Sequence, residues 1–278
     1  MPSDDVVALL TLRGQIADSI GQGGPIGGKR VGISFQDVSH LLKQAFAIPN
    51  LLAVVLVVNS PGGSPTQTSL VANFVRQKAD ETEVPVYAIV EDIAASGGYW
   101  IACAADEIFI DANSTVGSIG VIHPGFGAIE LMKKIGVESR IMTSVKNKAG
   151  MNPFVAVEKE HVAIVEENMM VLQENFVSWV KKRRPGIKDD DVFSGRVFIG
   201  ETAKEKGLVD DVSTLAEMIE KKWPGREDIK LVEVKRKLEG GLMSLIGQLF
   251  GSSVRVMDQF SNLIETSKSP GIVPIMRS

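Results

Sequence analysis

The chain is poor in the residue types that form disulfides and metal sites. Its 278 residues include one cysteine and three histidines. Cys103 has no partner within the chain for a disulfide. Its place in the apolar run 100–105 predicts a small core residue rather than a reactive thiol. We expect neither a metal nor a cofactor.

The chain also lacks a basic block and a long apolar run. The net charge is −4, so nothing in the charge pattern supports nucleic-acid binding. The longest apolar run, Leu51–Val58, is far shorter than the roughly 20 residues that cross a bilayer, and it predicts a buried strand. The acidic N-terminus has neither the basic start nor the apolar core of a secretory signal. We therefore expect a soluble protein that is cytoplasmic or membrane-peripheral.

What the chain does have is an alternation of strand and helix patterns. Ala53–Val58 and Val84–Val90 are β-branched, continuously apolar segments typical of strands buried on both faces. Each is followed by a turn and a helical pattern, over about Thr66–Ala79 and from about Ser96. Such repeats predict an α/β fold with a mainly parallel sheet and flanking helices.

Further elements are predicted nearer the C-terminus. We expect short strands over 118–122 and 138–143 and a long helix over about 157–182, with an apolar stripe that includes Ile164, Leu172 and Phe176. The composition changes after Leu238. We therefore divide the chain into a main body, 1–236, and an amphipathic tail, 237–278. The tail is expected to pack on the body or on another subunit, with contact to a membrane surface as an alternative.

Two glycine-rich junctions follow the two buried strands, at Asn59–Gly63 (NSPGG) and Ala94–Gly98 (AASGG). Because the carboxyl ends of parallel strands meet at one edge of a sheet, both junctions are expected at the edge where such sheets bind ligands. Glycines there expose backbone amides, and the amide of Gly97, with that of Gly62 or Gly63, can stabilise an oxyanion.

Ser96 is the candidate nucleophile at the second junction, although a serine that begins a helix is also a common N-cap. A serine hydroxyl needs a base. His40 and His161 fall within helical patterns and are expected to be surface or packing residues, which leaves His123, Lys146 and Lys148. A lysine acts as a base only when it is neutral, which requires burial or a nearby cation. The residue types alone do not choose among these three.

Four motifs in order resemble a known family. They are the two glycine junctions above, Thr115–Val121 (TVGSIGV) and Lys148–Pro153 (KAGMNP), and the segment 195–210 extends the similarity. The chain resembles the signal peptide peptidase A family, the S49 serine peptidases, from about Val6 to Val234. The resemblance implies a ClpP/crotonase-like fold of repeated ββα/βαβ units.

The resemblance also implies roles for individual residues. Ser96 is expected to be the nucleophile and Lys148 the base of a Ser–Lys dyad, with Ser118 orienting the lysine and Gly63 and Gly97 in the oxyanion hole. The implied activity is endopeptidase cleavage of signal-peptide remnants or other apolar peptides. Family members often form rings, so we expect a homo-oligomer whose site is shared between subunits. Many members carry a membrane anchor, and we expect no such segment among these residues.

Three alternative functions remain. A ClpP-like peptidase would pair Ser96 with His123. Crotonases share the fold and a two-amide oxyanion hole, so acyl-CoA chemistry is a second possibility, although those enzymes rely on acidic residues. A ring-forming scaffold with an inactive site is the third.

Overall fold

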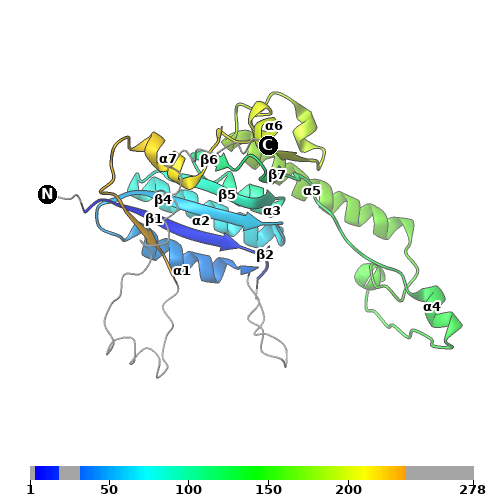
Figure 1. Ribbon diagram of the computed structural model, residues 1–278. Helices are drawn as coiled ribbons and strands as arrows, with labels where there is room; N and C mark the ends of the chain where they lie inside the picture. Colours follow the sequence, from blue (N-terminus) through cyan, green and yellow to red (C-terminus); the bar gives the residue numbers. More distant parts are fainter. Residues whose placement is uncertain (1–3, 19–31, 236–278) are drawn as a thin grey trace, which may run out of the picture. The chain divides into compact units, whose positions relative to one another are not determined.

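The computed structural model describes residues 4–18 and 32–235 (Figure 1). The predicted tail, 237–278, lies outside the described residues. The strands are β1 (Val6–Arg13), β2 (Gln15–Ile16), β3 (Gly32–Ile33), β4 (Leu51–Ser60), β5 (Val86–Ala95), β6 (Glu107–Ile110), β7 (Thr115–Gly117), β8 (Val197–Ile199), β9 (Asp211–Val212) and β10 (Lys230–Glu233).

The helices alternate with these strands. They are α1 (Phe35–Phe46), α2 (Pro65–Thr82), α3 (Gly97–Ala102), α4 (Ile129–Lys134), α5 (Lys159–Arg183), α6 (Gly200–Glu205) and α7 (Leu215–Lys222), with 3₁₀ turns η1 (Lys146–Ala149) and η2 (Asp190–Phe193). Among the described residues, no helix combines the length and hydropathy needed to cross a bilayer.

The main sheet has the order β10-β1-β4-β5-β6-β9, and every neighbouring pair on this path is parallel. β7 continues alongside the end of β5, and β8 pairs with β7 in the antiparallel direction. The predicted α/β class with a mainly parallel sheet is therefore confirmed. β8 was not predicted, because a three-residue strand leaves little periodic signal.

Alternate strand residues divide the core between the two faces of the sheet. Leu10 and Leu56 pack with α1, α2 and α3 in the larger cluster, which also contains Cys103. Val7 and Val55 lie on the other face with Met218 of α7. Cys103 is fully buried, which confirms the prediction of a core residue, and burial raises the pKa of its thiol to about 12.

The β4–α2–β5 crossover places the two glycine junctions side by side. Ser60, at the end of β4, is in register with Ala94 of β5. The turn after β4 leads directly into α2, because Ser64 caps that helix by accepting a hydrogen bond from the Gln67 amide and Pro65 occupies its first turn. Both junctions therefore lie at the carboxyl edge of the sheet, as predicted.

Residues 122–158, here called the arm, contain α4 and η1 and extend away from the sheet in Figure 1. The arm exposes large apolar side chains, including Phe126 at 76% and Met142 at 97%. The strand predicted over 138–143 is wrong, since these residues form no strand. The apolar stripe predicted for the long helix is only partly correct, because Phe176 is buried whereas Ile164 and Leu172 are exposed.

Candidate active site

Ser96 lies in a strained turn between β5 and α3. Its φ is 51° and its ψ is −123°, a conformation that costs a non-glycine residue about 1–3 kcal/mol. The Ser96 amide donates to the Gly117 carbonyl oxygen at 2.8 Å and holds the turn against β7. Its side chain makes no capping hydrogen bond, although Ser96 is the N-cap residue of α3. A sharp strand-to-helix turn of this kind presents a nucleophile at the edge of a sheet.

The Gly97 amide opens α3, where the first amides of a helix have no partner within the helix. The Gly63 amide lies close by, because a Cβ on Gly97 would be 3.4 Å from the Gly63 nitrogen. Gly63 forms a parallel bridge with Ile16, but the bonds of that bridge use the Gly62 carbonyl and the Ser64 amide. The Gly63 amide therefore points away from Ile16, and the two amides form a pair of donors beside Ser96.

Gly62 has a different place in the site. Its amide donates to Ser60 Oγ at 3.1 Å, so this donor is already in use. Its φ is +99°, and a Cβ there would lie 2.8 Å from both the Gly97 nitrogen and the Ser96 Cβ. Gly62 is needed for space rather than as a donor, which leaves Gly63 and Gly97 as the candidate oxyanion pair.

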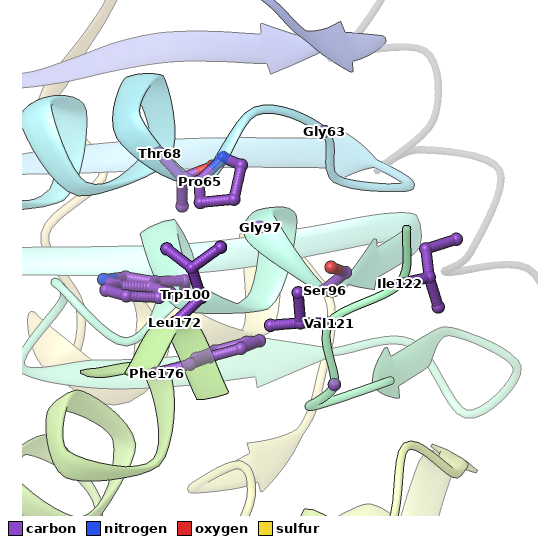
Figure 2. A pocket seen from close by; sticks show the side chains of 11 residues that line it. Gly63, Pro65, Thr68, Ser96, Gly97, Trp100, Val121, Ile122, Leu172 and Phe176 are labelled. Carbon is purple, nitrogen blue, oxygen red and sulfur yellow. The ribbon is translucent and has the colours of Figure 1, made fainter. Parts of the chain in front are cut away.

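An apolar cavity of about 110 Å³ opens next to Ser96. Figure 2 shows the Ser96 side chain beside Val121 and Ile122, with Trp100, Leu172 and Phe176 at the other end of the cavity. The rings of Trp100 and Phe176 stack with their centroids 4.7 Å apart. Trp100 was not predicted as a site residue, although it stands four residues after Ser96, the spacing that places two residues on one helix face.

The segment 118–122 forms one wall of this cavity without joining the sheet. It was predicted to be a strand, but the pairing of β7 ends at Gly117 and residues 118–122 form no strand. Ser118, with φ 51°, donates its amide to the Arg196 carbonyl oxygen at 2.7 Å. It lines a neighbouring hollow together with Gln173 and Gly195, and it directly follows the residue that binds the Ser96 amide.

Comparison with known proteins agrees with this geometry. Residues 78–226 match peptidase family S49. The chain is 30% identical over 251 residues to a protein of Enterococcus faecium named for signal peptide peptidase SppA. The aligned region covers 88% of this chain and 71% of that protein. The chain belongs to peptidase family S49. The resemblance of the four motifs to this family is therefore confirmed.

A second relative of this S49 chain is much longer. The chain is 39% identical over 222 residues to the Na(+)/H(+) antiporter NhaA of Brucella melitensis biotype 1. The aligned region covers 79% of this chain but only 30% of the length of that protein. Two solved structures of the 1510-N membrane-bound stomatin-specific protease share the fold, with TM-scores of 0.52 and 0.51 at 14% and 16% identity. They cover 84% and 87% of this chain and 100% and 97% of theirs. The expected ClpP/crotonase-like fold is confirmed.

The three candidate bases lie on the arm of this S49 chain rather than at Ser96. Lys146 and Lys148 belong to η1, and His123 lies in a groove with Phe126 and Met151. All three side chains are exposed. Among the described residues of one chain, no lysine or histidine lines the cavity beside Ser96. A single chain therefore brings together the candidate nucleophile and two amide donors, but none of the three candidate bases.

The two lysines of η1 differ in their partners. Lys146 Nζ lies 2.5 Å from Glu160 Oε2 and 3.7 Å from Glu158 Oε2. The hydrogen bond with Glu160 raises the pKa of Lys146, which makes it a poorer base near neutral pH. No carboxylate among the described residues forms an ion pair with Lys148, whose amine is exposed to solvent.

Proposed function

We propose that this S49 chain is a serine endopeptidase in which Ser96 is the nucleophile and Lys148 the general base. The observation that carries the proposal is the strained turn at Ser96. The Ser96 hydroxyl makes no capping hydrogen bond and lies beside two amide donors at the mouth of an apolar cavity. In the two 1510-N structures of similar fold, a serine is replaced by alanine in one and a lysine in the other, which also contains a substrate peptide.

The reaction follows from these groups. Neutral Lys148 accepts the Ser96 proton as Oγ attacks the carbonyl carbon, and the Gly63 and Gly97 amides bind the resulting oxyanion. Collapse of the intermediate breaks the C–N bond, and protonated Lys148 gives its proton to the leaving amine. Water, deprotonated by Lys148, then hydrolyses the acyl-enzyme and regenerates the Ser96 hydroxyl. Ser118, beside the Ser96 turn, is assigned to orient the lysine amine.

We further propose that Lys148 acts on the Ser96 of a neighbouring subunit in a homo-oligomeric ring. The site of one chain lacks a base, and the base stands on an arm whose apolar side chains face solvent. An exposed apolar surface of this extent is typical of a protein interface. Packing of the arm against another copy would cover these side chains and exclude water from the lysine amine, which favours its neutral form.

The substrate class follows from the cavity and its wall. Trp100, Leu172 and Phe176 suit an apolar side chain next to the scissile bond. Residues 120–122 join no strand of the sheet and suit main-chain pairing with an extended peptide. Apolar peptides, such as the signal-peptide remnants suggested by the name of the Enterococcus faecium relative, fit both features.

The assignment of the base predicts different results for three variants. Lys148→Ala is expected to lower kcat at least about 1000-fold on an apolar peptide, since no proton acceptor remains. Lys146→Ala and His123→Ala should stay within about threefold of wild type, because Lys146 is held by Glu160 and neither side chain is assigned to the reaction. Loss of turnover in His123→Ala alone would favour the Ser–His alternative. Loss in Lys146→Ala alone would reassign the base.

Covalent labelling of Ser96 separates a serine peptidase from an inactive scaffold and from a crotonase-like enzyme. A fluorophosphonate probe is expected to label the wild-type chain and to leave Ser96→Ala unlabelled, because the probe reacts with an activated serine. An inactive scaffold would assemble normally and remain unlabelled under all conditions. A crotonase-like enzyme would turn over an acyl-CoA thioester without needing Ser96.

Leu172 provides a test of the cavity as the substrate pocket. Leu172→Phe is expected to lower kcat/KM for a peptide with leucine before the scissile bond about tenfold relative to one with alanine, because the larger ring reduces the cavity. Val171→Phe is the matched control, since Val171 is 54% exposed and does not line the cavity. An unchanged leucine-to-alanine preference in Leu172→Phe would exclude the cavity as the pocket.

A further inference from the structure

His161 has an environment that the proposed reaction does not explain. It lies in the first turn of α5 and is 6% exposed. Both ring nitrogens are buried, and neither has a hydrogen-bond partner among the described residues. A buried polar group without a partner is unfavourable, so the ring of His161 contributes through its packing rather than through hydrogen bonds.

The ring packs against the chain just after the proposed base. A Cβ on Gly150 would lie 2.5 Å from both Cγ and Cδ2 of His161, so the imidazole covers the Cα of Gly150. Of residues 121–161, all of which the structure describes, only Gly150 and His161 are buried. The contact between them is therefore the single buried packing point of the segment that carries Lys148.

Gly150 is also the residue that ends η1. Its amide approaches the Asn147 carbonyl oxygen at 3.4 Å, and the Lys148 amide approaches the Val145 carbonyl oxygen at 3.3 Å. Lys148 stands two residues before Gly150 on this short turn. A shift of Gly150 relative to the ring would thus shift the Lys148 backbone as well. The exposed bonds from Lys146 and Asn147 to Glu160 restrain the same turn from the side, where solvent weakens ion pairs.

We propose that His161 is a positioning residue for Lys148. Its imidazole packs against Gly150, and this contact fixes the position of η1 relative to α5. The inference rests on the proposed function, because it concerns the base of that reaction. Displacing a reacting group by about 1 Å costs on the order of 100-fold in rate. The contact therefore matters to the chemical step more than to substrate binding.

His161→Ala is expected to lower kcat about 10- to 100-fold and to leave KM within about twofold, since the cavity at Ser96 does not include this residue. His161→Leu keeps a side chain of similar bulk against Gly150 and should recover kcat to within about threefold of wild type. His40→Ala, which removes an exposed histidine from α1, is the control and should match wild type.

A double-mutant cycle tests the contact itself. Gly150→Ala is expected to lower kcat about 10- to 100-fold in the wild-type background. It should cost less than about threefold in the His161→Ala background, where the added methyl finds free space. Equal losses in the two backgrounds would show that the residues do not act through one another and would overturn the proposal.

The proposed function and the positioning role of His161 fail in different ways. If Lys148→Ala retains turnover, the proposed function is wrong. If Lys148→Ala is inactive while His161→Ala and Gly150→Ala match wild type in kcat, only the positioning role is wrong. Native mass and melting temperature are measured for each variant. A His161→Ala oligomer that dissociates and regains full kcat at high protein concentration would also overturn the proposal, since His161 would then act on assembly.

Discussion

Mixing Ser96→Ala protein with Lys148→Ala protein is expected to restore peptidase activity that neither variant has alone. Each variant retains the group that the other lacks, and the lysine of one subunit is proposed to serve the serine of the next. With random mixing, about a quarter of the sites in a closed ring combine both native groups, because each group is native in half of the subunits. The measurement is turnover of an apolar peptide by the co-expressed variants, compared with each variant alone.

The control for this experiment is a double variant, Ser96→Ala with Lys148→Ala, co-expressed with either single variant, which provides no site with both groups. Different affinity tags on the two chains show whether mixed oligomers form. Mixed oligomers without activity would place serine and lysine of one site in the same subunit. The location of all candidate bases on the exposed arm argues for the opposite result.

Gly97→Ala is expected to lower kcat at least about 100-fold, which is the usual effect of removing one oxyanion donor. The added methyl would lie 3.4 Å from the Gly63 nitrogen and 2.5 Å from Thr68 Oγ1. It therefore blocks the approach of an oxyanion to the Gly63 amide and strains the packing of α3 against α2. Turnover of an apolar peptide and the melting temperature report these two effects separately.

Thr68→Ala provides the matched background for this prediction. Thr68 is buried and its hydroxyl donates to the Ser64 carbonyl oxygen at 2.8 Å. Removing the hydroxyl in the double variant, Gly97→Ala with Thr68→Ala, relieves the closest contact and should restore part of the melting temperature. The low kcat should remain, because the methyl still covers the Gly63 amide. Recovery of kcat in parallel with stability would mean that Gly97 serves packing alone.

The parallel core was predictable because it depends on local patterns. The β-branched run in β4 and the run that begins β5 identify buried strands, and each glycine junction indicates a sharp turn after its strand. β5 nevertheless continues to Ala95, beyond the predicted end at Val90, through Glu91 and Asp92. Glu91 accepts a hydrogen bond from Arg13 of β1 and Asp92 accepts one from Asn59 of β4, and such contacts cannot be read from the sequence of β5 alone.

The arm was the least predictable part of the fold. The strand pattern over 138–143 has no neighbouring strand to pair with in the described chain, and a strand without a partner gains no ladder hydrogen bonds. The apolar positions Ile164 and Leu172 of α5 resemble a core-facing stripe, yet both are exposed, and the first buried apolar side chain of the helix is Phe176. An apolar pattern indicates that a surface will be covered, but not by which element or which subunit.

By itself the sequence determined the α/β class, the family and the placement of Ser96 between two glycine junctions, because strand patterns and tight turns depend on residues close together in the chain. Tertiary structure alone decided that Gly62 provides space while Gly63 and Gly97 leave their amides free. It also decided that Glu160 binds Lys146. Finally, it placed Lys148 on the arm, away from the Ser96 cavity of its own chain. These outcomes depend on contacts between distant residues, and the energies of such contacts are set by packing and the exclusion of water rather than by local residue patterns.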